Sequence, residues 1–223
     1  MIIAIMKSNL VEGPVRKIGI QSRSLTGTMP NGNRYESSLE RDLMILLDFD
    51  PHVKFYTPQP ITIRYRDKNN IWHKYIPDGL IEYYPENTSF DSTPVLVEVK
   101  YRNEFVGKFN DWVPKFRAAN QYAKENGWIF KILTDDRIRT PFLKNVKFLT
   151  SYKHIYDPVM NLEIEEKLRI SSVATPQNIL NTLFFDKWNQ AKVLPIIWGM
   201  VARRELQIDL SVPITMNSRV WMI

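Results

Sequence analysis

The chain has 223 residues and a mass of 26.3 kDa, enough for one large domain or two small ones. Its hydrophobic fraction of 44% and charged fraction of 24% are typical of globular proteins and exclude a mostly disordered or fibrous chain. The sequence has no cysteine and only three histidines, which excludes disulfides, thiolate metal sites and a cysteine nucleophile. Any bound metal is therefore expected to be a hard cation held by carboxylates.

The formal net charge is +6 and the pI is near 9.4. The first 34 residues carry five bases against a single acid, Glu12. This excess suits a polyanionic partner such as nucleic acid, although a merely soluble basic protein would look the same. No apolar run approaches the ~20 residues of a membrane span, and the first ten residues do not have the order of a signal peptide. We therefore expect no membrane partner.

Polar residues dominate 1–33, which we interpret as a basic N-terminal arm. Leucines at helical spacing predict an amphipathic helix over 36–47 that Ser37 or Ser38 caps and that ends before Pro51. Residues 61–65 and 72–78 flank a polar turn and predict a β-hairpin.

Further along, 79–84 and 94–101 are expected to be strands, the second of them central and buried. A helix over 108–126 and a strand over 127–136 complete a strand–helix–strand crossover in a mixed sheet. The pattern then changes near a linker at 150–165.

Beyond that linker the sequence predicts helices over 161–170, 175–189 and 191–206 and a short terminal hairpin. Three helices and a hairpin are typical of a winged-helix arrangement. The expected fold class is α/β, with a mixed-sheet core and a smaller winged-helix-like C-terminal domain. The expected domains are the arm over 1–33, the core over 34–158 and the C-terminal domain over 159–223.

Two short segments contain the candidate catalytic residues. They are Pro77-Asp78 and, after a gap, Glu98-Val99-Lys100. Period two places Glu98 and Lys100 on one face of their strand, and a hairpin return would bring Asp78 beside Glu98. Adjacent carboxylates repel unless a cation lies between them, and Mg²⁺ prefers such oxygen ligands. A lysine beside the ion would hold the attacking water, and together they would support phosphodiester hydrolysis. Alternatively, Glu98 and Lys100 only form a surface ion pair at the solvent-exposed end of a strand.

The preceding helix adds Glu36 and Glu40, which are four residues apart and therefore neighbours. Either carboxylate would be able to reach the metal site, or both lie on a solvated helix edge. The order acidic helix, hairpin, PD, apolar strand, ExK, helix and strand resembles the restriction-endonuclease-like core of the PD-(D/E)xK nucleases.

A closer resemblance covers about residues 34–150. Ser37 to Glu40, Phe49-Asp50-Pro51, Gln59-Pro60, Pro77-Asp78 and Glu98-Val99-Lys100 resemble the pattern of the TnsA family, the endonuclease subunits of heteromeric bacterial transposases. Some members of that family have Gln at the place of Glu98, so this chain lies nearer the general nuclease consensus. In residues 160–223 the resemblance is weak, although the family's C-terminal domain is also winged-helix-like.

The resemblance implies a Mg²⁺-dependent endonuclease that nicks the 5′ ends of a transposon in cut-and-paste transposition. Glu40, Asp78 and Glu98 would hold one or two Mg²⁺ ions, for which Mn²⁺ is expected to substitute. The Val99 carbonyl would add a ligand and Lys100 would orient the water. The implied partners are double-stranded DNA at transposon ends, an integrase-type transposase subunit (TnsB-like) and an AAA+ ATPase regulator (TnsC-like). The implied location is the bacterial cytoplasm, in association with the nucleoid.

Two other functions stay open at this point. A free-standing restriction or repair nuclease with the same core would cut DNA alone, and a non-catalytic DNA-binding adaptor would keep the core only as a scaffold. Several residues are further candidates for DNA contact, each with an ordinary surface role as the alternative: Arg16, Lys17, Arg23, Arg102 and Gln121.

Overall fold

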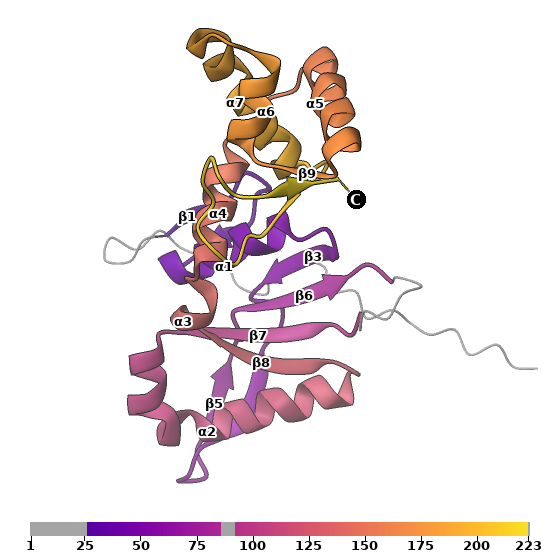
Figure 1. The fold of residues 1–223 in the computed structure, drawn as a ribbon. Coiled ribbons are helices and arrows are strands. Elements are labelled where there is room, and N and C mark those ends of the chain that lie inside the picture. Colours follow the sequence, from indigo (N-terminus) through magenta and orange to yellow (C-terminus); the bar gives the residue numbers. More distant parts are fainter. Residues whose placement is uncertain (1–25, 86–91, 223) are drawn as a thin grey trace, which may run out of the picture. The chain divides into compact units, whose positions relative to one another are not determined.

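The computed structural model describes residues 26–85 and 92–222 (Figure 1). The chain divides into two compact units, Met1–Ile138 and Arg139–Ile223. None of the described helices is long and apolar enough to cross a membrane.

A four-stranded mixed sheet forms the centre of the first unit (Figure 1). Its order is β3-β6-β7-β8, with β3 and β7 antiparallel to β6 and with β8 parallel to β7. The expected mixed sheet is therefore confirmed. The strands are β3 (Val53–Pro58), β6 (Gly79–Tyr83), β7 (Val95–Lys100) and β8 (Ile129–Thr134).

Strand β7 is buried on both faces, as its apolar sequence predicts. Successive side chains alternate, so Val97 packs in the cluster that contains α1 (Ser38–Phe49). Leu96 packs in the opposite cluster with α2 (Arg102–Glu125). The same alternation turns Glu98 toward the α2 face, and this direction sets the position of the site.

Helix α1 begins and ends where the sequence signals indicate. The Ser37 hydroxyl accepts a hydrogen bond from the Glu40 amide at 3.1 Å and caps the first turn. Asp50 is the C-cap, immediately before Pro51.

Strands β4 (Ile63–Arg66) and β5 (Trp72–Tyr75) form the predicted hairpin, as a two-stranded sheet separate from the central one. Strand β3 was not predicted. It is an edge strand whose residues are mostly half-buried or exposed, so its sequence lacks a clear apolar alternation.

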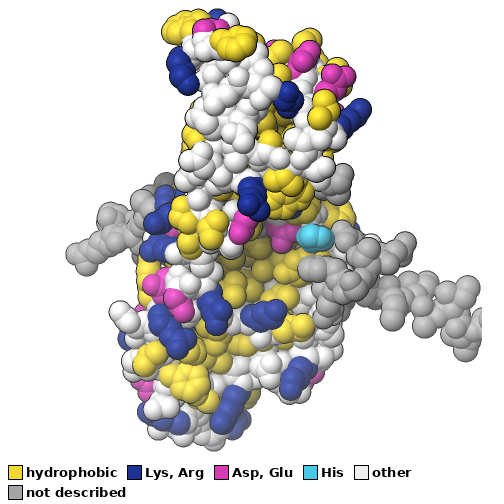
Figure 2. Space-filling view, in the orientation of Figure 1, with side chains coloured by type: hydrophobic (Ala, Val, Ile, Leu, Met, Phe, Trp, Pro, Cys, Tyr) yellow, Lys and Arg dark blue, Asp and Glu magenta, His cyan; other side chains and the backbone are white. Residues whose placement is uncertain are grey.

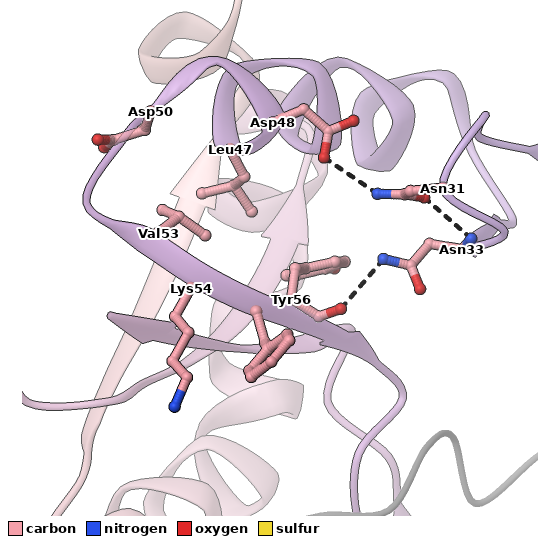
Figure 3. A pocket seen from close by; sticks show the side chains of 9 residues that line it. Asn31, Asn33, Leu47, Asp48, Asp50, Val53, Lys54 and Tyr56 are labelled. Atoms are coloured by element: carbon pink, nitrogen blue, oxygen red, sulfur yellow. Dashed lines mark hydrogen bonds between the residues drawn. The ribbon is translucent and has the colours of Figure 1, made fainter. Parts of the chain in front are cut away.

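The predicted arm extends too far along the chain. Strands β1 (Gly27–Thr28) and β2 (Arg34–Tyr35) pair in a small hairpin. At its turn, Asn31 donates to Asp48 at 3.0 Å and Asn33 donates to the Tyr56 carbonyl at 3.1 Å (Figure 3). These bonds attach the hairpin to α1 and β3, so residues 26–33 belong to the first unit.

Two elements next to the sheet differ from expectation. Helix α2 begins at Arg102 rather than at residue 108, with the Arg102 amide donating to the Asp135 carboxylate at 2.7 Å. That aspartate opens α3 (Asp135–Ile138), a short helix that the sequence did not predict.

The second unit has the order helix, helix, strand, helix, helix, strand, strand, whereas the sequence predicted three helices followed by a hairpin. Its three-stranded sheet is antiparallel in the order β10-β11-β9, and the terminal hairpin is confirmed. The elements are α4 (Pro141–Thr150), α5 (Pro158–Ser171), β9 (Val173–Ala174), α6 (Pro176–Leu183), α7 (Lys187–Ala202), β10 (Gln207–Ile208) and β11 (Val220–Trp221).

The helix expected over 175–189 is two helices. Thr175 caps α6, which ends at Leu183, and Asp186 caps α7 by accepting from the Asn189 amide at 2.9 Å. The Asp186 cap satisfies an amide at the start of α7 that a continuous helix would have bonded internally.

The division between the units lies at Ile138, earlier than the expected domain boundary at residue 158. The reason is α4, which was not predicted and which packs against α7. Its Asn145 amide donates to the carbonyls of Leu210 and Val212 at 2.9 and 2.7 Å. These contacts place residues 139–158 in the second unit.

Candidate active site

The sheet register brings Asp78 and Glu98 side by side. Strands β6 and β7 are antiparallel with Gly79 opposite Val97, so the residue before Gly79 faces the residue after Val97. The hairpin return that the sequence suggested is therefore present. Asp78 lies immediately before β6 and Glu98 near the end of β7.

Three oxygen acceptors surround the ammonium group of Lys100. Its Nζ lies 3.0 Å from Glu98 Oε1 and 3.5 Å from Asp78 Oδ2. It also donates to the Val99 carbonyl at 2.9 Å. The Pro-Asp and Glu-x-Lys segments thus form one cluster around a single cation, and the surface ion pair of the alternative interpretation does not describe it.

Glu98 is almost completely buried, with 2% of its surface exposed. Buried carboxylates require partners, and this one has two besides Lys100. The Tyr75 hydroxyl donates to Oε2 at 2.6 Å, and Lys115 Nζ lies 3.0 Å from Oε1. Burial, followed by the charge of Glu98, raises the pKa of Tyr75, which therefore stays protonated and remains a donor.

Sequence reasoning missed Tyr75 and Lys115. Tyr75 lies three residues before Asp78 at the end of β5, and the packing of that strand against α2, rather than a local sequence pattern, brings its hydroxyl to Glu98. Lys115 is one of several bases on α2, and only the packing of that helix selects it. The ring of Trp112 borders both amines, with its centroid 4.8 Å from Lys115 Nζ and 5.9 Å from Lys100 Nζ.

The backbone and side chain of Asp78 are both held. Its Oδ2 accepts from the Val99 amide at 2.6 Å, while its carbonyl accepts from the Gln59 amide at 3.0 Å and the Tyr56 hydroxyl at 3.2 Å. Burial, followed by the nearby charge of Glu98, raises the pKa of Asp78 to about 7, although Lys100 opposes the shift. Two carboxylates crowded in this way favour a cation between them.

Lys100 is charged at neutral pH. Burial alone would lower its pKa, but the charges of Asp78 and Glu98 together outweigh that effect and raise it. The lysine is therefore suited to donating hydrogen bonds and poorly suited to accepting a proton.

Glu40 is placed differently from the predicted metal ligand. Its carboxylate lies at the start of α1 and accepts from the Glu36 amide and the Ser37 hydroxyl at 2.9 Å each. Burial raises the pKa of Glu40, and its charge acts on Asp78 and Lys100 at longer range. Glu36, the alternative ligand, contributes its backbone amide to this arrangement. Over residues 26–85 and 92–222, no three His, Asp or Glu side chains are grouped to hold a metal.

Two of the predicted DNA-contact residues lie in the described part of the chain, and both are on α2. Arg102 is exposed at the start of α2. Gln121 is exposed six residues beyond Lys115, on another side of the helix, and donates to Glu125 at 2.8 Å. The positions predicted in the arm lie outside the described residues: Arg16, Lys17 and Arg23.

Comparison with protein families gives two matches that follow one another along the chain. Residues 50–135 match the TnsA-like endonuclease N-terminal domain, and residues 137–210 match the TnsA endonuclease C-terminal domain. No curated protein matches the chain. The first match contains Asp78, Glu98 and Lys100, and the junction between the matches lies next to the division of the two units at Ile138. The two matches together cover most of the chain, which therefore belongs to the TnsA family of transposase endonuclease subunits.

Proposed function

We propose that this chain nicks DNA at the 5′ ends of a transposon in a reaction that requires Mg²⁺, during cut-and-paste transposition. The observation that carries the proposal is the convergence of two carboxylates and one carbonyl on the Lys100 ammonium. The same oxygen atoms, which attract the ammonium groups of Lys100 and Lys115, are of the kind that a divalent cation prefers as ligands.

The donor set fits Mg²⁺ or Mn²⁺ by its chemistry. Asp78, Glu98 and the Val99 carbonyl offer only oxygen atoms, which these ions prefer to nitrogen and sulfur. The raised pKa of Asp78, caused by burial and by Glu98, reflects repulsion that a divalent ion would relieve. Glu40 would join this set on leaving its hydrogen bonds at the start of α1.

When bound, the ion would lower the pKa of a water and stabilise the charge that develops on the attacked phosphate. The residues of the chain hold the carboxylates and the attacking water in position. Tyr75 and Lys115 fix the Glu98 carboxylate. The Val99 amide fixes Asp78. Lys100, protonated because of its two carboxylate neighbours, donates a hydrogen bond that orients the attacking water.

The proposed partners follow from the same assignment. The substrate is double-stranded DNA at transposon ends, and an integrase-type, TnsB-like subunit cuts and joins the 3′ ends. A TnsC-like AAA+ regulator binds the second unit, so removal of that unit is expected to weaken this binding while leaving the sheet of the first unit intact. The setting would be the bacterial cytoplasm, at the nucleoid.

Partner dependence distinguishes this proposal from a free-standing nuclease. A duplex with transposon ends, labelled on each strand, is incubated with Mg²⁺ and the chain, with and without the partner transposase. We expect cutting at the 5′ ends only when the partner is present. Equal cutting without the partner would favour the free-standing nuclease. No cutting in either case, with a partner that is active at the 3′ ends, would favour the DNA-binding adaptor.

The metal ligands have a separate test. Fe²⁺ substituted for Mg²⁺, with ascorbate and peroxide, generates radicals that break the polypeptide close to the ion. We expect chain breaks near residues 78 and 98–100 that excess Mg²⁺ suppresses. Breaks confined to other segments would contradict the assigned ligands, whatever the activity of the protein.

A further inference from the structure

The β4–β5 ribbon has two faces of opposite character. Its cross-strand pairs are Ile63 with Tyr75, Arg64 with Lys74, Tyr65 with His73, and Arg66 with Trp72. Paired residues point to the same side and successive pairs alternate. One face therefore carries the apolar and ring side chains of 63, 65, 73 and 75. The other, which we call the basic face, carries Arg64, Arg66, Trp72 and Lys74.

The apolar face holds the ribbon in place. Ile63 and Tyr75 are buried in one cluster with Ala119 and Ala123 of α2. A two-stranded hairpin alone is marginally stable, so this packing accounts for its order. All four side chains of the basic face are exposed, including Trp72 with 61% of its surface.

The charges of the basic face lower the stability of the isolated protein. Arg64 lies directly opposite Lys74, and like charges in that position destabilise a sheet. Among the described residues, no acid forms an ion pair with any of its three bases. The nearby Asp67 bonds instead to His73, on the opposite face, at 2.9 Å. Exposed Trp72 lies under the Arg66 guanidinium at 4.6 Å.

One end of the ribbon lies at the active site. Tyr75, at the end of β5, donates to Glu98, and Asp78 follows three residues later. On the β4 side, Arg64 and Arg66 border an open groove of about 550 Å³ whose far wall includes Arg117 of α2. Figure 2 shows Lys and Arg side chains over the part of the first unit that Figure 1 labels β5 and α2.

We propose that the basic face and Arg117 bind the sugar-phosphate backbone of duplex DNA beside the phosphodiester that reaches the Asp78–Glu98–Lys100 cluster. The inference rests on the proposed function, which makes DNA the substrate. DNA supplies one negative charge per about 1.7 Å of duplex, which would neutralise the adjacent cations. A two-stranded ribbon also fits the major groove, so the face can approach the duplex closely.

Salt-dependent binding tests the proposal. The variant Arg64→Ala/Arg66→Ala/Lys74→Ala is compared with Lys54→Ala/Lys124→Ala/Lys131→Ala, which removes three exposed bases elsewhere in the first unit. Binding to a labelled duplex is measured by anisotropy from about 50 to about 200 mM salt. For the first variant we expect roughly tenfold or greater weakening and a slope of log K against log salt that is shallower by about 3. Equal behaviour of the two variants, or no binding by the wild type at about 50 mM salt, would overturn the proposal.

A single substitution separates binding from folding. Lys74→Thr relieves the like-charge pair with Arg64 and keeps a residue suited to strands. We expect the melting temperature to stay the same or rise while DNA affinity falls several-fold. Unchanged affinity in the folded variant would contradict the proposed role.

The lack of cysteine permits a direct test of proximity. Lys74→Cys and Lys124→Cys each introduce one thiol, to which a short photo-crosslinker is attached. We expect crosslinks to the duplex from residue 74 and few from residue 124. The reverse pattern would overturn the placement. The binding and crosslinking assays do not require cleavage. Absence of cutting with intact ribbon crosslinks would therefore contradict only the proposed function. Normal cutting without ribbon crosslinks would contradict only this inference.

Discussion

The first unit holds positive charge in two different ways. At the end of β7, Lys100 and Lys115 are mostly buried and each lies 3.0 Å from the Glu98 carboxylate. On the β4–β5 ribbon, Arg64 and Lys74 are exposed, lie opposite each other and have no acidic partner among the described residues. Buried charges of both signs meet at one point, whereas exposed charges of one sign are spread over a face.

The difference indicates a division of labour. Burying a charge is expensive, so a buried cluster with partners for every member fixes the positions of a few atoms, as chemistry requires. Exposed cations keep their hydration but repel one another, and a partner with many regularly spaced phosphates relieves this repulsion. Substitutions in the buried cluster should therefore affect cutting without affecting DNA affinity. Substitutions on the basic face should affect DNA affinity first.

The largest expected effect is on the cluster. Asp78→Ala and Lys100→Ala should each reduce 5′-end cutting by about a thousandfold or more, because each removes a group at the reacting centre. Duplex affinity should stay within a few-fold of the wild type. Strand-resolved cleavage with the partner transposase measures the first quantity and anisotropy the second. Near-normal cutting by either variant would remove that residue from the site.

A smaller loss is expected at the residues that hold Glu98. Tyr75→Phe and Lys115→Met keep the size of the side chain but remove a hydrogen bond or charge from that carboxylate. Loss of such supporting contacts costs roughly 10- to 100-fold in activity or metal affinity. Higher Mg²⁺ should restore part of the rate, as expected for a positioning role. A loss that Mg²⁺ leaves unchanged, accompanied by weaker DNA binding, would instead assign these residues to the DNA surface.

The buried cluster also predicts a pH dependence of stability without metal. Burial and Glu98 raise the pKa of Asp78 from its ordinary 3.8 to about 7. Between these values the folded state binds more protons than the unfolded state, so this group makes stability fall as pH rises from about 4 to about 7. Asp78→Asn should remove that part of the dependence and raise the melting temperature at pH above 7. An identical pH profile for the variant and the wild type would contradict the assigned shift.

The smallest effect is at the cap of α1. Ser37→Ala should cost about 1 kcal/mol of stability, because it removes the partner of the Glu40 amide and one donor to the Glu40 carboxylate. Ser38→Ala is the matched comparison, since Ser38 lies inside the helix and its hydroxyl pairs with the exposed Tyr101 hydroxyl at 3.2 Å instead of capping an amide. Chemical denaturation measures both. Equal effects of the two substitutions would contradict the cap assignment.

Local signals explain what the sequence predicted well. The cap at Ser37, the stop before Pro51 and the apolar run of β7 are each encoded within a few residues. The adjacency of Asp78 and Glu98 followed from a hairpin return combined with period two. These features do not depend on distant packing.

What the sequence did not predict depends on tertiary contacts. Strand β3 is an exposed edge held by pairing with β6, and α4 is defined by its packing against α7. Lys115 is distinguished from the other bases of α2 only by its distance to Glu98. The family resemblance implied Glu40 as a metal ligand, whereas in the structure its carboxylate accepts from the Glu36 amide and the Ser37 hydroxyl at the start of α1. Whether it also binds metal stays a prediction.

The most direct test of the account is cleavage of a transposon-end duplex, labelled separately on each strand, by wild type and Lys100→Ala with Mg²⁺ and the partner transposase. The account predicts that the wild type cuts the 5′ end, that Lys100→Ala does not, and that partner cutting at the 3′ end is the same with both. Equal 5′ cutting by the two proteins, or loss of both cuts with Lys100→Ala, would contradict the claim that this cluster performs 5′-strand cleavage.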